Sequence, residues 1–209
     1  MIVRLLSVAA VGLLLVAQER PVGVFEQHRD IGETPKEGSI SYDADSAEYR
    51  VTGGGANIWA NVDAFQFAWR RMSGDVTVTA DVQFIGTGAV DHRKAVLMVR
   101  QNLNADSAYA DVALHGDGLT SLQYRVKAGN ETAEKRSDLN MPVRIRIARR
   151  GNEFTMYAGK PGEELKATGP VTVALEDPVY VGIGVCSHDA NVLETAIFSN
   201  VKIESLESK

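Results

Sequence analysis

Alternation of apolar and polar side chains is the feature that most limits what this chain can fold into. In residues 75–86, the apolar side chains fall on one parity and the polar ones on the other, from Val76 and Val78 to Val82 and Phe84. Successive side chains of a β-strand point to opposite faces, so the pattern predicts a strand with one buried face. Segments 119–129 and 143–149 alternate in the same way. Their predicted inward-facing residues are Leu122, Tyr124, Val126, Val143, Ile145 and Ile147.

Similar short stretches follow one another along most of the chain, and turn residues such as Gly, Asn and Asp separate them. Their ranges are 39–43, 48–53, 65–72, 95–101, 107–116, 152–159, 171–175, 179–187 and 195–206. Ten or more such strands with no helical period between them predict an all-β sandwich or jelly roll. Residues 179–187 are apolar on both parities, which indicates a strand that is covered on both faces or central in its sheet.

The first residues predict an exported protein. The apolar run from Leu5 to Ala17 has the length of a signal-peptide core and is too short to cross a bilayer comfortably. We expect residues 1–18 to be a signal peptide, or alternatively an uncleaved N-terminal anchor and the only membrane attachment, and residues 19–209 to form one domain. The predicted location is the periplasm or the exterior. Cys186 is the single cysteine, so no intrachain disulfide forms, and we expect it to be buried and inert.

A run of three glycines, Gly53 to Gly55, stands before the segment that holds both tryptophans, Trp59 and Trp69. A phosphate-binding loop needs a following helix and usually a lysine, and neither is present here. The glycines therefore indicate a bend or bulge where the backbone turns or crosses another element. The formal net charge of −5 does not favour nucleic acid as a partner.

Three stretches carry a resemblance to a known family. They are GGGANIWANVDAFQFAWRRMSGDVTVTADV, KAVLMVRQNLNADSAYADVALHGDGLTSLQYR and VYVGIGVCSHDANVLETAIFSNVKI. Together they resemble the concanavalin A-like (laminin-G-like) sandwich domains of bacterial exported proteins, and most closely the group labelled "regulation of enolase protein 1, concanavalin A-like". Val96 departs from that pattern, which has glycine there. The resemblance implies a concanavalin A-like jelly roll of two antiparallel sheets. The superfamily includes lectins, carbohydrate-binding modules and glycanases, so it does not choose an activity.

Carbohydrate or glycan binding without catalysis is the first function that we expect. Sugars need planar polar side chains for their hydroxyls and aromatic rings for their C–H faces. By strand parity, several such residues face outward, and on a curved sheet they would line a concavity with both tryptophans at its rim. The predicted ligand-binding residues are Arg100, Tyr109, Gln123, Arg125, Arg144, Trp59 and Trp69. Replacing Arg125 with alanine would then weaken binding and leave the melting temperature nearly unchanged. The alternative is that these arginines are only the solvated face of a sheet and that the tryptophans anchor the core.

Two further functions remain open. A glycoside-cleaving hydrolase or lyase of the same superfamily would need two carboxylates, about 5 Å apart in retaining enzymes and farther apart in inverting ones. The strands show no run of carboxylates spaced by two, so no catalytic residue is predicted. A protein-interaction module is the second alternative, with the basic segment 143–150 facing an acidic partner.

Metal chemistry has weak support in the sequence. The four histidines have no ligand spacing, which argues against zinc. Calcium is the one candidate cofactor, because sandwich modules often hold it with carboxylate and carbonyl oxygens. Asp63 and Asp189 are its candidate ligands, although residues 187–191 also read as a plain polar hairpin loop.

Overall fold

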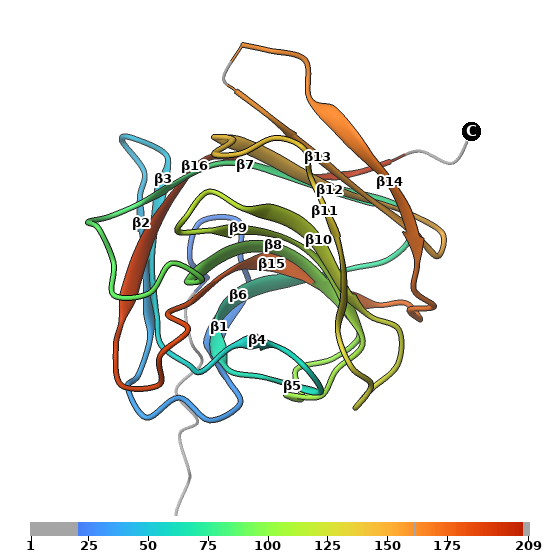
Figure 1. Ribbon diagram of the computed structural model, residues 1–209. Helices are drawn as coiled ribbons and strands as arrows, with labels where there is room; N and C mark the ends of the chain where they lie inside the picture. The colour runs from blue at the N-terminus through green and yellow to red at the C-terminus, as the bar shows by residue number, and fades with distance from the viewer. Residues whose placement is uncertain (1–20, 161, 207–209) are drawn as a thin grey trace, which may run out of the picture.

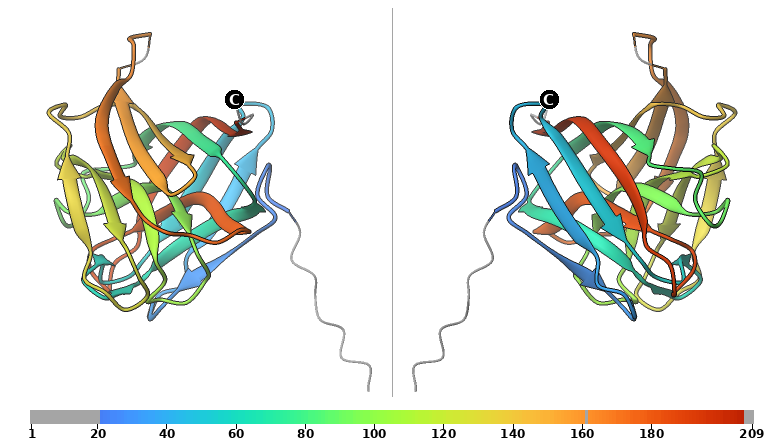
Figure 2. Two further views of the ribbon diagram at one scale, coloured as in Figure 1. Left: turned by 90° about the vertical axis from the view of Figure 1, so that its right-hand side faces the viewer. Right: turned by 90° about the vertical axis from the view of Figure 1, so that its left-hand side faces the viewer.

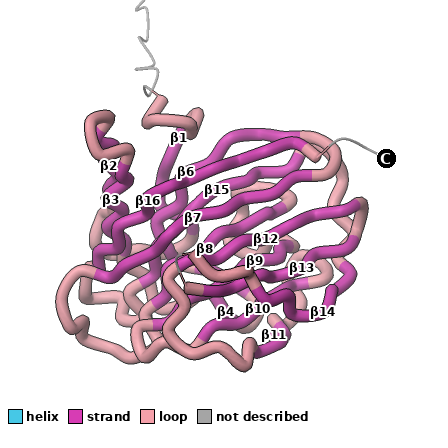
Figure 3. Tube along the Cα trace, turned by 90° about the horizontal axis from the view of Figure 1, so that it is seen from above, coloured by secondary structure: helices cyan, strands magenta, loops and turns pink. Residues whose placement is uncertain are grey.

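The computed structural model describes residues 21–160 and 162–206 of the chain, so the expected leader at 1–18 lies outside the described residues. Two seven-stranded antiparallel sheets lie face to face (Figures 1 and 2). In the described residues the chain forms strands and loops without a helix (Figure 3). They accordingly include no apolar helix of bilayer-spanning length. The predicted all-β sandwich is therefore confirmed.

The first sheet, called the concave sheet here, bends around a short hairpin that lies beneath it in Figure 1. Its strands, in spatial order, are β1 (Gln27–Ile31), β6 (Phe65–Met72), β15 (Val179–Cys186), β8 (Lys94–Arg100), β9 (Tyr109–His115), β10 (Thr120–Arg125) and β11 (Ala133–Arg136). The second sheet, called the outer sheet, consists of β14 (Lys166–Thr172), β13 (Glu153–Gly159), β12 (Arg144–Arg150), β7 (Val76–Phe84), β16 (Glu194–Ser205), β3 (Glu48–Gly53) and β2 (Ser39–Asp43). The short hairpin pairs β4 (Ile58–Trp59) with β5 (Val62–Asp63).

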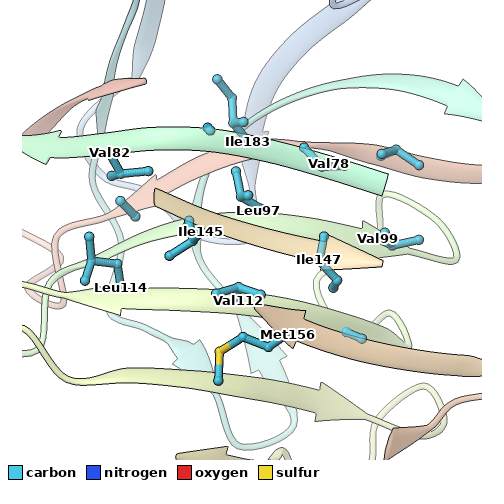
Figure 4. Packing of buried hydrophobic residues seen from close by; sticks show 14 of the residues in the cluster. Val78, Val82, Leu97, Val99, Val112, Leu114, Ile145, Ile147, Met156 and Ile183 are labelled. Carbon is cyan, nitrogen blue, oxygen red and sulfur yellow. The ribbon is translucent and has the colours of Figure 1, made fainter. Parts of the chain in front are cut away.

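The main core lies between the two sheets, where the predicted parity places it. Val78 and Val82 of β7 and Ile145 and Ile147 of β12 meet Leu97 of β8 from the concave sheet (Figure 4). Burying an aliphatic side chain of this size contributes roughly 1.5–3 kcal/mol, so the alternating pattern supplies the main driving force for the sandwich. The expected inward positions are wrong for Val126 and Val143, which are 46% and 38% exposed. Strand β10 ends before Val126 and β12 begins after Val143.

The concave sheet is buried on both faces, which explains why residues 179–187 are apolar on both parities. Strand β15 lies between β6 and β8, and its Val181 and Ile183 point into the main core. A second buried cluster covers the opposite face of the sheet, and it contains Phe67, Trp69 and Cys186. The β4–β5 hairpin lies on this side (Figure 1). The hairpin was not predicted, and neither were the edge strands β1 and β11.

The three consecutive glycines lie where β3 leaves the outer sheet and passes against the concave sheet. A Cβ on Gly53 would overlap the carbonyl of Val185, and a Cβ on Gly55 would overlap the carbonyl of Ala64. Gly55 also has a φ of +106°, and its carbonyl accepts a hydrogen bond from the Ser187 hydroxyl at 3.2 Å. The expected crossing of two backbones is confirmed, and the segment continues into a hairpin instead of a helix.

Replacing Gly55 with alanine is expected to lower the free energy of unfolding by about 3 kcal/mol, since backbone strain and the displaced Ala64 carbonyl add together. Gly129 is the matched control because its φ is +74° and nothing lies within 4 Å of an added Cβ. Gly129→Ala should lower the free energy of unfolding by about 1–2 kcal/mol, from backbone strain alone. Urea denaturation measures both values, and equal losses would contradict the crowding at Gly55.

Candidate functional site

Five of the predicted binding residues share the face of the concave sheet that points away from the main core, and Trp69 of β6 is one of them. Arg100 of β8 lies opposite Tyr109 of β9, which lies opposite Arg125 of β10, so the three form one row across the sheet. Gln123 of β10 is in the next row, opposite Asp111 of β9. Strand parity therefore brought the four on β8, β9 and β10 together correctly. Their role in binding a ligand remains a prediction.

The expectation that these side chains are open to solvent is wrong. Arg100, Tyr109 and Arg125 have no exposed surface, and Gln123 is 1% exposed, because the β4–β5 hairpin and the neighbouring loops cover them. The guanidinium of Arg125 donates to the backbone carbonyls of Ala60 at 3.1 Å, Ser107 at 3.0 Å and Asn130 at 3.0 Å. These contacts hold the hairpin and two loops against the sheet, so Arg125 has a structural role.

Asp63 of β5 is the counter-charge of this network. Its carboxylate accepts two hydrogen bonds from Arg125, at 2.7 and 3.0 Å, and forms an ion pair with Arg100 at 3.4 Å. Burial raises the pKa of Asp63, and the Arg125 hydrogen bond and the charges of the two arginines oppose that rise. The guanidinium of Arg125 also lies 4.9 Å from the centre of the Tyr109 ring. This network fixes the hairpin, and it leaves these groups no contact with solvent.

Two other predicted residues lie elsewhere than expected. Arg144 is on β12 of the outer sheet, where its guanidinium pairs with Asp81 of β7 at 2.6 Å, so it does not converge with the others. The expected rim position is also wrong for Trp69, which is 3% exposed and stacks on Phe67 with 5.7 Å between ring centres. Parity assigns a side chain to a face of its own sheet, and it does not say which of two sheets holds the strand.

One pocket opens on the concave face beside the covered network, and it has a volume of about 200 Å³. It is called the concave-face pocket here. Its lining residues come from β4 and the segment that leads into it, from β8 to β11, and from the loops around them. They are Asn57, Trp59, His92, Lys94, His115, Leu119, Gln123, Glu134, Arg136 and His188. Trp59 and Gln123 are the two predicted binding residues among them.

Lys94 organises the polar side of this pocket. Its ammonium group donates to Asn57 Oδ1 at 2.8 Å, to the Ile58 carbonyl at 2.7 Å and to Gln123 Oε1 at 3.3 Å. The amide of Asn57 in turn donates to Nε2 of His188 at 3.0 Å in the tautomer that keeps the proton on Nδ1. Burial lowers the pKa of Lys94, and the charge of Asp111 is the largest influence that opposes this. Two planar amides are thus held in fixed orientations, which is the arrangement that binds hydroxyl groups selectively.

Trp59 forms the aromatic side of the pocket. It is half-buried, and the ammonium of Lys94 lies 5.3 Å from its ring centre. Trp59 and Asn57 also line a second hollow of about 690 Å³, whose other residues include Pro35, Val62 and Ala64. The indole is therefore shared by a polar pocket and a more apolar one. It is the one tryptophan that is placed to stack on a ligand.

Three histidines meet at the pocket although they are far apart in the sequence. The ring centre of His92 lies 5.6 Å from that of His115 and 5.8 Å from that of His188. Nδ1 of His115 donates to the Leu119 carbonyl at 3.0 Å in the tautomer that leaves Nε2 unprotonated. Burial and the charge of Lys94 lower the pKa of His115 to about 4, and the same two causes lower the pKa of His188.

Two carboxylates lie on this face, which is the feature that a glycosidase would need. Asp111 of β9 and Glu134 of β11 are both opposite Gln123 of β10, so one strand separates them. Strand spacing puts their backbones about 9–10 Å apart, near the upper limit for inverting glycosidases. Asp111, however, has no exposed surface and does not line the pocket, so it has no path to a substrate. Burial raises its pKa well above the usual range, and Arg136 holds the pKa of Glu134 low against the effect of burial.

Asp63 does not suit a calcium ion, and a calcium-binding role for Asp189 remains a prediction. The oxygens of Asp63 already accept hydrogen bonds from two positively charged arginines, which would repel a cation. The Asp189 carboxylate accepts a hydrogen bond from the backbone N–H of Asn191 at 2.8 Å within its own loop. No group of three or more His, Cys, Asp or Glu side chains suited to a metal occurs between residues 21 and 206, residue 161 apart. Cys186 is buried as expected, and burial raises the pKa of its thiol to about 11.

Several pocket residues were not predicted, although part of the signal was present. Lys94 has the same parity as Arg100 on β8, and His115 has the same parity as Tyr109 on β9, so extending the rows would have found both. Asn57, His92 and His188 come from loops, for which no periodicity applies. Only the folded chain brings them to the sheet.

No family model matches the sequence, and no curated protein matches it. Solved structures do match. A functionally unknown protein from Saccharomyces cerevisiae has a TM-score of 0.66 at 13% identity, over 87% of this chain and 98% of that chain. The carbohydrate binding module CBM66 from Bacillus subtilis has a TM-score of 0.51 at 14% identity, over 89% and 98%. Lectin II from Ulex europaeus has a TM-score of 0.52 at 12% identity, over 87% and 100%.

These likenesses concern the fold. Glycoside hydrolases are also among the solved structures that match, and a xylan beta-1,4-xylosidase from Bacillus halodurans is matched over 34% of its length. With the sheet order described above, they identify the chain as a jelly-roll β-sandwich of the concanavalin A-like type. Its structural neighbours include a lectin, a carbohydrate-binding module and glycoside hydrolases.

Proposed function

We propose that this protein is a non-catalytic glycan-binding sandwich and that the concave-face pocket holds one sugar unit. The observation that carries the proposal is the pairing of a half-buried indole, Trp59, with two amides, Asn57 and Gln123, that Lys94 holds in place. An aromatic face next to fixed hydrogen-bonding groups suits a sugar ring, which has a C–H face and a rim of hydroxyls. The pocket volume of about 200 Å³ is below the usual range for drug-sized ligands, which indicates a single unit or a chain end.

The support for a binding role over a catalytic one comes from Asp111. An inverting glycosidase needs both carboxyl groups at the substrate, and Asp111 is covered. Membership of the "regulation of enolase protein 1" group and export from the cell are part of the same proposal, and they rest on the sequence resemblance and on the leader expected from residues 1–18. The protein-interaction alternative loses support because two arginines of the basic segment 143–150 are already paired, Arg144 with Asp81 and Arg149 with Asp177.

Replacing Trp59 with alanine is expected to reduce glycan binding at least tenfold, because a central aromatic residue of a binding site contributes about 2 kcal/mol or more. Trp59→Phe, which keeps a ring face, should retain part of the affinity. Tyr157→Ala is the control, since that half-buried aromatic residue is on β13 of the outer sheet. A glycan array followed by calorimetry on the best hit, with the full chain, measures the effect. Equal binding by wild type and Trp59→Ala would reject this pocket as the site, and release of reducing sugar would reject the non-catalytic role.

A further inference from the structure

The concave-face pocket contains a buried lysine, Lys94, that forms no ion pair with a carboxylate of the described residues. Lys94 is 2% exposed, and all three hydrogen bonds of its ammonium go to neutral oxygens. Within the described part of the chain, no carboxylate oxygen lies within 4.0 Å of it. A buried cation without a close counter-charge is costly, so the site is electrostatically incomplete. The chain as a whole has a net charge of −5, which makes a positive pocket more notable.

The other charged groups at the pocket do not remove this excess. Glu134 is the one carboxylate among the lining residues, and its Oε1 is already paired with Arg136 Nε at 2.6 Å. Arg136 keeps its two terminal nitrogens available, and its side chain is 66% exposed at the mouth of the pocket. The charges of Glu134 and Arg136 cancel. Asp111 is the other carboxylate whose charge acts strongly on Lys94, but burial raises the pKa of Asp111 well above its usual range, which favours its neutral form and leaves the charge of Lys94.

Two of the three histidines at the pocket, His115 and His188, respond to the same positive potential. The charge of Lys94 lowers the pKa of both His115 and His188, next to the larger effect of burial. Both rings are therefore neutral near pH 7, and each would gain a proton more readily if an anion entered. His115 is the better placed for this, because its Nδ1 is engaged by Leu119 and the incoming proton would go to Nε2.

We propose that the concave-face pocket selects a sugar unit bearing an anionic substituent, a carboxylate or a sulfate, which lies among Lys94, Arg136, His92 and His115. This inference rests on the proposed glycan-binding function and adds the class of glycan. The anion supplies the counter-charge that Lys94 lacks, while Trp59 and the two amides hold the ring and its hydroxyls. A metal ion is the other occupant that three histidines suggest. Lys94 would repel it, and Nε2 of His188 and Nδ1 of His115 are already hydrogen-bonded.

Binding of the anion is expected to be coupled to proton uptake. The groups that face His115 are Lys94 of β8, His92 of the preceding loop, Asp117 of the following turn and Glu134 of β11. A bound anion favours the charged imidazole, so the complex holds more protons than the free protein at pH values above about 4. Affinity for an acidic sugar should therefore rise as the pH falls from 7 to 5, by up to about tenfold per proton taken up and per pH unit. Carboxylates with a pKa near 3.5 remain ionised over that range.

The experiment compares matched glycans on the full chain by titration calorimetry. The probes are oligogalacturonate, the neutral galactose oligomer of the same length, a sulfated galactan oligomer and inorganic sulfate alone. The expected result is that the acidic oligomers bind at least tenfold more tightly than the neutral one, and that oligogalacturonate binding takes up protons when it is repeated in buffers of different ionisation enthalpy. Preference for carboxylate or for sulfate then identifies the substituent.

Arg136→Gln should reduce the affinity for the acidic oligomers about tenfold and leave the neutral oligomer unaffected. Arg71→Gln is the matched control, since Arg71 is 62% exposed and also faces a glutamate, Glu26, at 4.0 Å, but lies on β6 away from the pocket.

Neutral and acidic oligomers that bind equally, with both depending on Trp59, would overturn the anionic selectivity and leave the proposed function in place. Inorganic sulfate that binds as tightly as the sulfated oligomer would also overturn it. Failure of every glycan on the array would instead reject the proposed function.

Discussion

Arg125→Ala is expected to lower the free energy of unfolding by about 3–5 kcal/mol, because it leaves a buried carboxylate and several buried carbonyl groups without their donor. The carboxylate is Asp63, which would keep only its longer contact with Arg100. The free energy corresponds to a fall in melting temperature of roughly 10 °C or more for a domain of this size. Thermal unfolding followed by circular dichroism measures it. This expectation reverses the one based on sequence alone, in which Arg125 was a surface residue.

Arg144→Ala is the natural control for this substitution. It also removes an arginine that is paired with an aspartate, but the Arg144 side chain is 34% exposed, and Asn200 remains hydrogen-bonded to Asp81 at 2.8 Å. The expected loss is therefore below about 1 kcal/mol. Arg125→Lys should lose most of the stability as well, since an ammonium does not reproduce the two-pronged contact with Asp63. A melting temperature for Arg125→Ala close to that of Arg144→Ala would show that the covered network contributes little.

The second large effect is a loss of stability in mild acid that depends on His115. Its pKa is about 4 in the folded protein and about 6.5 in an unfolded chain, so the unfolded state binds the extra proton between these values. Stability is therefore fully present above pH 6.5 and is lost as the pH falls toward 4. The full loss from this one group is about 3 kcal/mol. The cause is burial together with the positive charge of Lys94 and, to a smaller degree, of His92.

The measurement is a series of urea denaturation curves between pH 7 and pH 4 for the wild type and for His115→Gln. Glutamine keeps a hydrogen-bonding group near Leu119 and has no proton to gain. Other groups titrate in both proteins, Asp111 in particular with the opposite sign, so the result is the difference between the two curves. Between pH 7 and pH 4, the free energy of unfolding of the wild type should fall by about 3 kcal/mol more than that of His115→Gln. Parallel curves would mean that His115 is not desolvated in the folded state.

The alternation of side chains was sufficient to predict the sandwich and the rows on the concave sheet, because parity depends only on local backbone geometry. It placed Arg100, Tyr109, Gln123 and Arg125 on one face, and it placed Leu122 in the core. It did not reveal that β12, which carries Arg144, pairs with β7 in the other sheet, since strand order is set by contacts between distant segments. Which sheet a strand joins, and which loops cover a face of that sheet, depend on tertiary structure. These two properties determine which of the predicted binding residues are buried and which lie apart from the others.

The hairpin is the element that sequence reasoning missed with the largest consequence. Its two strands, Ile58–Trp59 and Val62–Asp63, are too short to show periodicity. The glycines before them predict a bend, but they do not predict the hairpin that follows it. Asp63 is an acidic residue inside a largely apolar stretch, which indicates a buried partner of opposite charge. Recognising its partners would still have required knowing that residues 63, 100 and 125 meet in space.

The anchoring of the β4–β5 hairpin has a consequence for how this surface can diversify. Its carbonyl groups at Ile58, Trp59 and Ala60 are each held by a side chain rooted in the sheet beneath, Lys94 or Arg125. An insertion or deletion between Asn57 and Asp63 would put those carbonyls out of reach of their donors, so this stretch has a fixed length. The loop that carries His92 is tethered in a similar way, since Glu194 of β16 accepts hydrogen bonds from the Ala89 amide at 2.7 Å and from Arg93 at 2.6 Å. Two of the segments that line the pocket therefore have a fixed length, and substitution of lining side chains is the route by which its chemistry can change.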